Sequence, residues 1–218
     1  FGIELSKIET CLITHAHFDH LYPDELWCRV PDVAHIERAP LTLYATHASY
    51  SRIANAMLDH NVDETGRVGL KKIKPFAPFE VQGYTVTPLK ARHDPTTDPV
   101  IFLIQKDGKN LLYANDTGFF PGETAAYLKN SGVKLDLVSF DCTGGLIPDK
   151  DHGKYSHLNL IGDVMMRDLL KENGNLKENT QFVITHFSHN GTPIHEEMEK
   201  AASKQGFITA YDGFEIEF

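Results

Sequence analysis

The most informative stretch of this sequence is a run of imidazole and carboxylate side chains near its start. Four potential metal ligands, His15, His17, Asp19 and His20, fall within six residues, directly after the apolar segment 11–13. A strand that ends in several imidazoles and a carboxylate gathers donors that suit zinc, iron or manganese. Ordinary polar loop residues are the weaker alternative, because histidine has no packing reason to recur at this density. The run therefore predicts a metal site and metal-assisted hydrolysis.

Strands must position these side chains, and other apolar runs of strand character also end in potential ligands. Three such runs are Leu111–Ala114 before Asp116, Leu135–Phe140 before Asp141, and Phe182–Thr185 before His186. The first of them follows Ile101–Ile104 and the turn 106–109, so this pair is predicted to form a hairpin. A rigid sheet presents a site through polar residues at its strand ends, which is the arrangement we expect here.

Helices are predicted at three places. Residues Leu160–Glu172 carry apolar side chains near helical spacing, with Asn159 as the expected N-cap. A second helix is predicted over Pro193–Lys204, with Thr192 as N-cap and Pro193 at the first helical position. A third is expected around Ala48–Asp59.

The composition is that of a globular chain with one substantial core. With 218 residues, of which 41% are hydrophobic and 23% charged, the chain is predicted to form a single domain over residues 1–218. The stretch Asn61–Phe79 mixes glycine, proline and charge, and we interpret it as a connecting loop. The net charge of −9 disfavours binding of extended nucleic acid.

Cysteine usage and targeting signals bear on the compartment. Cys11, Cys28 and Cys142 form no C-x-x-C pair, which indicates neither a disulfide framework nor a cysteine zinc site and favours a reducing compartment. The sequence has no signal peptide and no apolar run long enough for a bilayer, so we predict a cytoplasmic protein without a membrane partner. Because the first residue is Phe1 and not Met, earlier sequence is expected to be unrepresented here.

Several motifs together resemble those of the metallo-β-lactamase-fold hydrolases, in the same order and over nearly the whole chain. They are Thr-His-Ala-His-Phe-Asp-His at 14–20, Ala-Arg-His93, Tyr-Ala-Asn-Asp116-Thr-Gly and Ile-Thr-His186-Phe-Ser-His189. Ser156-His157-Leu158 before a helix and the ending 210–216 are similar to the phosphoribosyl cyclic phosphodiesterase group. The resemblance implies an α/β fold, an αββα sandwich of two mixed sheets with outer helices, whose opening strands would precede Phe1.

The resemblance also implies a binuclear metal centre. His15, His17 and His93 would hold one ion, Asp19, His20 and His186 would hold the second, and Asp116 would bridge them. The cofactors would be two divalent ions, either zinc or manganese, with iron as a further option. Two such ions, offset by two carboxylates and one hydroxide, leave a net charge of about +1, which favours an anionic phosphodiester substrate attacked by metal-bound hydroxide.

The leaving alkoxide needs a proton, and His157 is the leading candidate for the general acid. The alternative for His157 is a structural role near the start of a helix. His189 would assist the chemistry or support His186, and Asp19 is a further catalytic candidate besides its ligand role. Asp141 is expected to organise a ligand or a loop. Tyr22 and Trp27 are expected to pack on the core, with stacking on a base or ribose as the alternative.

Three functions remain open at this stage. The leading one is a binuclear phosphodiesterase that acts on a small cyclic or nucleotide-like phosphodiester. The alternatives are a thioester or lactam hydrolase on the same metal platform, and a non-catalytic metal or nucleotide sensor. The predicted partner is the small substrate, without extended nucleic acid, and a homo-oligomer is compatible with the sequence.

Overall fold

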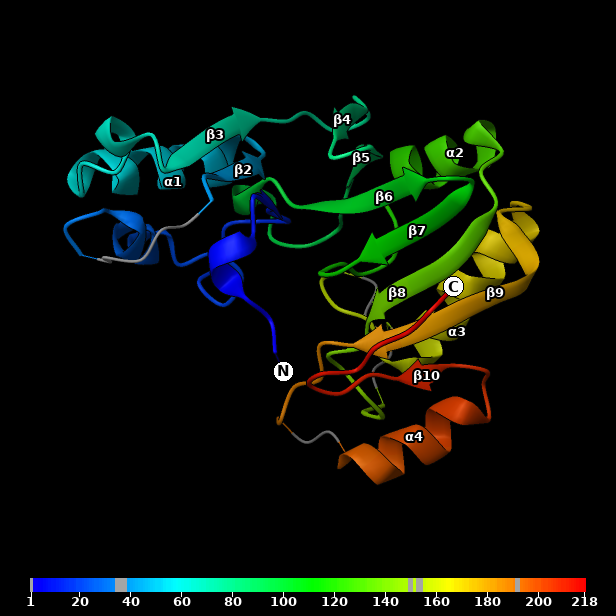
Figure 1. Cartoon of the computed structure of the whole chain (residues 1–218). Helices are drawn as coiled ribbons and strands as arrows, with labels where there is room; N and C mark the ends of the chain where they lie inside the picture. The colour runs from blue at the N-terminus through cyan, green and yellow to red at the C-terminus, as the bar shows by residue number, and fades with distance from the viewer. Residues whose placement is uncertain (1, 34–38, 149–150, 152–154, 191–192) are drawn as a thin grey trace. The chain divides into compact units, whose positions relative to one another are not determined.

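The computed structural model describes residues 2–33, 39–148, 151, 155–190 and 193–218. The chain divides into two compact units, coloured along the chain in Figure 1. Unit 1 comprises Phe1–Pro75 and Pro95–Pro99, and unit 2 comprises Phe76–Asp94 and Val100–Phe218. The single domain predicted over 1–218 stays a prediction. Among the residues that the structure describes, no helix combines the length and the apolar character needed to cross a bilayer.

Unit 1 is built on a three-stranded parallel sheet in the order β1-β2-β3. The strands are β1 (Thr10–Leu12), β2 (Leu41–Ala45) and β3 (Val68–Lys72). Helix α1 (His47–Asp59) joins β2 to β3, which confirms the predicted third helix with one more residue at its start. Short 3₁₀ turns complete the unit, namely η1 (Leu5–Lys7), η2 (Pro23–Arg29), η3 (Asp63–Thr65) and η4 (Pro95–Thr97).

The prediction of a connecting loop over Asn61–Phe79 is wrong, because this stretch contains η3 and β3 and the first residue of β4. Gly69 and the lysines of β3 hide its strand character in the sequence. The glycine has a packing reason, since a Cβ at Gly69 would lie 3.2 Å from the Thr42 hydroxyl on the neighbouring strand. Val68 is buried in the core of unit 1 beside Leu41, its register partner.

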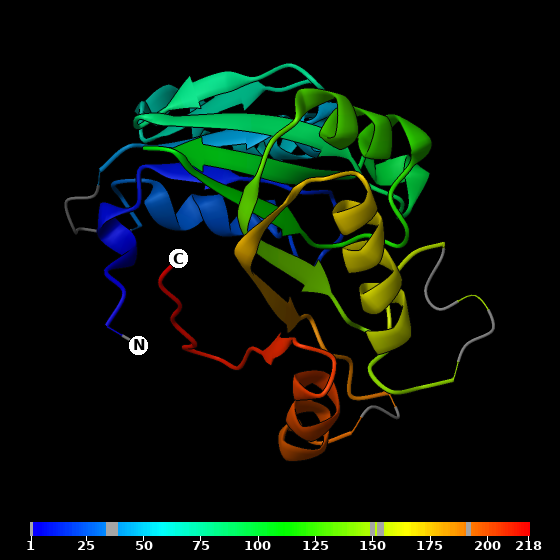
Figure 2. The ribbon, with the colours of Figure 1, turned by 90° about the vertical axis from the view of Figure 1, so that its right-hand side faces the viewer.

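Unit 2 is built on a seven-stranded mixed sheet in the order β10-β9-β8-β7-β6-β5-β4. The strands are β4 (Phe79–Val81), β5 (Tyr84–Lys90), β6 (Val100–Lys106), β7 (Lys109–Ala114), β8 (Leu135–Asp141), β9 (Leu176–Thr185) and β10 (Ile208–Thr209). Strands β4 to β7 pair antiparallel, and β7 to β10 pair parallel. Helices α2 (Gly122–Ser131) and α3 (Leu160–Glu172) lie on one face of this sheet, and α4 (His195–Ser203) lies beside β10 (Figures 1 and 2).

The predicted hairpin is confirmed as β6 and β7, which pair through Lys106 and Lys109 at the turn. The two turn residues, Asp107 and Gly108, have φ of 50° and 78°. Positive φ at both central positions suits the right-handed twist of a two-residue hairpin, and Asp-Gly is a favoured pair for it.

Helix α3 has the bounds predicted from the sequence, and its N-cap is Asn159 as expected. The Asn159 side chain accepts a hydrogen bond from the Gly162 backbone N–H at 2.9 Å. Helix α4 is shorter than predicted, because Ile194 has an extended backbone and the helix begins only at His195. Thr192, the expected N-cap, lies outside the described residues.

The core of unit 2 lies between its sheet and the helices. Leu112, Phe140 and Ile184, from three neighbouring strands, are fully buried there together with Leu128 of α2 and Leu170 of α3. This packing fixes β7, β8 and β9 as a rigid parallel group. Their carboxyl ends therefore meet at one edge of the sheet, where the sequence places potential ligands.

Candidate functional site

The ligand run of unit 1 forms a compact group just beyond β1. The chain turns back on itself there, because the backbone N–H groups of His20 and Leu21 both donate to the His17 carbonyl, at 3.1 and 2.8 Å. His15 is fully buried, and its Nε2 lies 3.0 Å from Nδ1 of His17. The rings of His15 and His20 are 4.4 Å apart between centroids, and His20 Nε2 lies 3.4 Å from an Asp19 carboxylate oxygen.

This donor set fits a divalent cation. Two imidazole nitrogens 3.0 Å apart either share one proton or face one ion, and a carboxylate stands next to the third ring. The Nδ1 atom of His15 lies 3.1 Å from the Thr14 hydroxyl, so an oxygen partner orients the ring and leaves Nε2 for a ligand bond. Imidazole with carboxylate is the ligand chemistry of zinc, manganese and iron sites.

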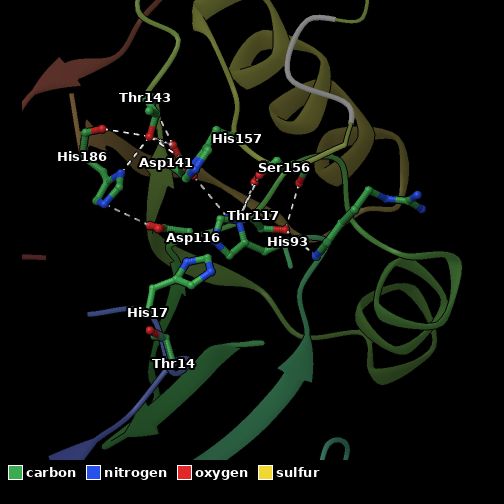
Figure 3. Close-up of polar contacts among 12 residues, drawn as sticks. Thr14, His17, His93, Asp116, Thr117, Asp141, Thr143, Ser156, His157 and His186 are labelled. Carbon is green, nitrogen blue, oxygen red and sulfur yellow. Dashed lines mark hydrogen bonds and ion pairs between the residues drawn. The ribbon is translucent and has the colours of Figure 1, made fainter. Parts of the chain in front are cut away.

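The second group lies at the carboxyl ends of the parallel strands of unit 2. Asp116 follows β7, Asp141 ends β8 and His186 follows β9. One donor atom from each of these residues and one from His157 all lie within 4.8 Å of one another. His186 Nε2 is 3.4 Å from Asp116 Oδ1, as Figure 3 shows. This group therefore also has the ligand types and the spacing of a metal site.

His157 and Asp141 form a close pair within this group (Figure 3). His157 Nδ1 lies 2.6 Å from Asp141 Oδ2, and Asp141 is fully buried while the His157 side chain is 30% exposed. The Asp141 carboxylate also accepts hydrogen bonds from the backbone N–H groups of Thr143, at 2.8 Å, and Thr117, at 3.3 Å. A carboxylate held in this way fixes the ring orientation and the tautomer of its histidine.

His157 does not sit in the first turn of helix α3, because the N-cap is Asn159. It lies in the loop before the cap, next to Ser156, whose hydroxyl and carbonyl oxygens lie 3.1 and 3.2 Å from His93 Nδ1. The rings of His93 and His157 meet edge to face at 4.7 Å. Unit 2 thus brings His93, His157 and His186 into one neighbourhood, each with an oxygen atom near its Nδ1.

The predicted site residues are therefore divided between the units. His15, His17, Asp19 and His20 gather in unit 1, and His93, Asp116, His157 and His186 gather in unit 2. A single centre with all seven predicted ligands stays a prediction. His189 follows His186 by three residues and is not one of the four donors grouped around Asp116 among the described side chains.

Two further residues contact the unit 2 histidines: Thr143, which the sequence reasoning did not single out, and Ser156, which it named only as part of a motif and without a role. Thr143 and Ser156 hold histidine rings through their oxygen atoms. The available sequence signal was weak: Thr143 follows a strand-end aspartate by two residues, and Ser156 directly precedes His157.

The packing prediction for Tyr22 and Trp27 is wrong. These side chains are 60% and 49% exposed, while Leu21 and Pro23 on either side of Tyr22 are buried instead. The Trp27 ring lies 6.4 Å from that of His60. At the start of η2 burial therefore alternates along the chain, so that Leu21 and Pro23 are buried and Tyr22 faces solvent.

Three ionisable groups with raised pKa values lie near the aspartates of the unit 2 group, and of these Asp163 and Cys142 are buried while Tyr113 is 39% exposed. Burial raises the pKa of the fully buried Asp163 carboxyl well above its usual value, and the nearby negative charge of Asp141 acts in the same direction, although the Cys142 thiol opposes it. Burial likewise raises the pKa of the Cys142 thiol, which is also near Asp163. Burial and then the charge of Asp116 raise the pKa of Tyr113. Burial thus favours the neutral, protonated forms of Asp163 and Cys142.

Comparison with known proteins identifies the architecture. Residues 2–195 match the family model described as the beta-lactamase superfamily domain. Among solved structures, Zn²⁺-bound PqqB from Methylobacterium extorquens is 19% identical with a TM-score of 0.71, over 97% of this chain and 73% of that one. The metallo-β-lactamase fold protein YhfI from Bacillus subtilis is 19% identical with a TM-score of 0.68, over 94% and 76%.

A diphosphatase from the PhnP family is 21% identical with a TM-score of 0.66, over 98% of this chain and 73% of that one. No curated protein sequence matches the chain. The structural similarities, at these identities, establish the metallo-β-lactamase fold with two sheets and helices, as the motif resemblance implied. The smaller sheet differs from the expectation of two mixed sheets, because all its described strand pairs are parallel.

Proposed function

Because this chain belongs to the beta-lactamase superfamily, we propose that it is a metal-dependent hydrolase of small phosphodiesters, either cyclic or nucleotide-like. The observation that carries this proposal is the Asp141–His157 pair, 2.6 Å apart, within the donor group of unit 2. An alkoxide is a poor leaving group that needs a proton, whereas a thiolate leaves without one. A positioned acid therefore favours a phosphodiester over a thioester as the substrate.

In this proposal the predicted ligands bind two divalent ions, as the motif resemblance implies. Zinc is the ion we favour, because the fold-related PqqB is described as Zn²⁺-bound. When bound, such ions supply an activated water near neutral pH and stabilise charge on the phosphoryl oxygens. The donor atoms of His15, His17 and His186 supply the nitrogen ligands that zinc prefers.

His157 carries the proton that the leaving oxygen takes. Its Nδ1–H donates to Asp141, so Nε2 is the ring nitrogen that exchanges a proton with the substrate. The buried negative charge of Asp141 stabilises the charged imidazolium before proton transfer and holds the ring in place during it. After transfer, the neutral ring regains a proton from water through its exposed side.

The proposed substrate is small because the chain is acidic. A net charge of −9 repels a long polyanion everywhere except near bound cations, whereas a compact phosphodiester experiences mainly the local field. The fold-related PhnP-family diphosphatase is consistent with phosphoryl chemistry on this scaffold. Comparison of a ribose cyclic phosphate with structured RNA across a salt series tests this point, and efficient RNA cleavage at physiological salt would contradict it.

The direct test is a panel of substrates given to the full chain loaded with Zn²⁺ or Mn²⁺. We expect the highest kcat/KM on a ribose cyclic phosphate or another alkyl phosphodiester, and no turnover after treatment with a chelator. A preference for the thioester or the lactam in the same panel would overturn the proposal. Metal binding without hydrolysis of any substrate would instead support a sensor.

A further inference from the structure

We propose that Thr143 is a positioning residue that sets the ring tautomer and the backbone conformation of His186, and so presents Nε2 of His186 as a ligand atom. This inference deepens the proposed function. It rests on that function for the ligand role of His186, but not for the tautomer itself. Thr143 lies two residues after the end of β8, and its hydroxyl oxygen contacts Asp141, His157 and His186 (Figure 3).

The Thr143 hydroxyl is itself held in place by Asp141. Its Oγ1 lies 2.7 Å from Asp141 Oδ1, and the backbone N–H of Thr143 donates to the same oxygen at 2.8 Å. Asp141 is fully buried at the end of a central strand, so this double contact fixes the threonine side chain to the rigid part of the sheet. The hydroxyl is a preorganised partner and not a freely rotating group.

Counting protons then assigns the tautomer of His186. The Thr143 oxygen lies 2.7 Å from His186 Nδ1 and 3.0 Å from the His186 carbonyl oxygen. A hydroxyl has one proton to donate, and both the Asp141 carboxylate and the carbonyl accept only. Donation of this proton to Nδ1 would leave the hydroxyl oxygen facing two acceptor oxygens with no proton between them, so one of these oxygens receives it. Nδ1 then meets a lone pair of the hydroxyl and itself carries hydrogen. His186 is therefore the Nδ1–H tautomer, in which Nε2 carries the ring lone pair, 3.4 Å from Asp116 Oδ1.

The same hydroxyl also steadies the backbone of His186. This residue has a φ of 63°, in the left-handed region that non-glycine residues adopt at an energetic cost. The Thr143 hydroxyl reaches both the ring and the carbonyl of this one residue, so it ties the side chain to the unusual backbone conformation. Strain of this kind persists only where surrounding contacts determine the conformation, and Thr143 supplies two of them.

Asp141 and Thr143 together give the neighbouring histidines the same orientation. Asp141 Oδ2 takes the Nδ1–H of His157 at 2.6 Å, and Thr143 takes the Nδ1–H of His186 at 2.7 Å. The two rings lie nearly parallel, with an interplanar angle of 13° and centroids 5.7 Å apart. Both rings thus keep Nε2 for chemistry, one as the proposed proton donor and the other as the proposed ligand.

The test uses Thr143→Val, which keeps the shape and removes the hydroxyl, and Thr143→Ser, which keeps the hydroxyl. Nitrogen-15 NMR of the histidine rings is recorded on metal-free full-length chain at a pH where the rings are neutral, with His186→Gln for assignment. We expect a protonated Nδ1 at His186 in the wild type and in T143S, and a shift towards protonated Nε2 in T143V. Affinity for Zn²⁺ should fall roughly 10–100-fold in T143V and recover in T143S.

Thr180→Val is the matched control. The Thr180 hydroxyl also bonds backbone groups, the Lys177 N–H and the Leu135 carbonyl, at the opposite end of β8 and β9. We expect T180V to leave the His186 tautomer and the Zn²⁺ affinity unchanged. A protonated Nε2 at His186 in the wild type would overturn the proposal without any variant. The proposal can therefore be refuted even if T143V folds poorly. The tautomer is read without metal or substrate, so failure of the substrate panel and failure of this inference are separate outcomes.

Discussion

Strand β8 carries two buried aspartates, one near each end. One binds a lysine and the other binds a histidine. Asp136, at the second residue of the strand, binds the Lys177 ammonium through both carboxylate oxygens at 2.7 Å and accepts from the Asn110 backbone N–H at 2.9 Å. Asp141, at the last residue, binds His157 at 2.6 Å and Thr143 at 2.7 Å. Lysine keeps its charge throughout the neutral range, whereas histidine can exchange a proton there.

The difference distinguishes a carboxylate that stabilises the sheet, Asp136, from a carboxylate that orients the proposed acid, Asp141. Burial alone pushes the pKa of Asp136 upward, but the hydrogen bond and charge of Lys177, the Asn110 N–H and the charge of Lys109 together hold that pKa below its usual value. Asp136 is therefore an anion at neutral pH and connects β7, β8 and β9 through Asn110 and Lys177. Asp141 instead orients the His157 ring, whose Nε2 is the proposed proton donor. The same residue type, equally buried on one strand, thus serves two purposes according to its partner.

Removal of the proposed acid should have the largest effect on activity. His157→Ala is expected to lower kcat by about 10²–10⁴-fold, the usual contribution of general acid catalysis, with metal content nearly unchanged. Steady-state kinetics and metal analysis of the same preparation check this. Loss of metal from H157A would make His157 a ligand and contradict the role given to it.

Asp141→Asn tests the orienting role of the carboxylate at the end of β8, and its effect should be smaller than that of H157A. The amide keeps the shape but can present its NH₂ group to His157, which would disturb the ring tautomer that the carboxylate fixes. We expect kcat to fall roughly 10–100-fold, the typical cost of losing an outer partner of a site histidine. Unchanged kcat in D141N would remove the contrast between the two aspartates.

Asp136→Asn is the matched variant at the other end of β8, near the start of the strand. It should leave kcat and KM unchanged but lower the free energy of unfolding by about 1–2 kcal/mol, below the upper range for charged hydrogen bonds because the Lys177 side chain is 32% exposed. Because the folded pKa of Asp136 is lowered, its contribution is present above the ordinary value of 3.8 and is lost as pH falls through the folded pKa. Denaturant unfolding at neutral pH and below pH 4 measures both effects, and reduced turnover in D136N would argue against a purely structural carboxylate.

Asp163 should have the smallest effect on activity, and the pH dependence of its contribution to stability should be opposite to that of Asp136. Its folded pKa is raised, so its contribution to stability is present below the ordinary value of 3.8 and is lost as pH rises through the folded pKa. We expect the wild type to lose stability with rising pH above about 4 through this group. Asp163→Asn should have a flatter profile in urea unfolding, and an unchanged slope would show that Asp163 ionises normally.

The sequence predicted the elements whose signals are local. Helix α3 was predicted to its ends because Asn159 and the spacing of its apolar residues mark it, and the hairpin because Asp107-Gly108 suits only a tight turn. Strand β3 was missed because Gly69 and two lysines interrupt its pattern. Helix α2 was missed because only Thr124 and Leu128 of its residues are buried, which leaves little hydrophobic periodicity.

The site followed the same rule. As candidates, the residues of the run at 15–20 could be chosen because they are nearly contiguous, and Asp116, Asp141 and His186 because each lies at or just after the end of a recognisable strand. The contacts of Thr143 with His186 and of Ser156 with His93 join residues far apart in sequence. They depend on the parallel pairing of β8 with β9 and on the path of the loop before α3, for which no local pattern exists.

The measurement that tests the central claim most directly is the dependence of rate on the leaving group, for wild type and H157A. Aryl and alkyl phosphodiesters of graded leaving-group pKa are compared under saturating metal. If Asp141-held His157 delivers the proton, the wild-type rate should depend weakly on leaving-group pKa, and H157A should lose much more on alkyl than on nitrophenyl esters. An equal loss on both classes would contradict the account, because a group that does not protonate the leaving oxygen has no reason to distinguish them.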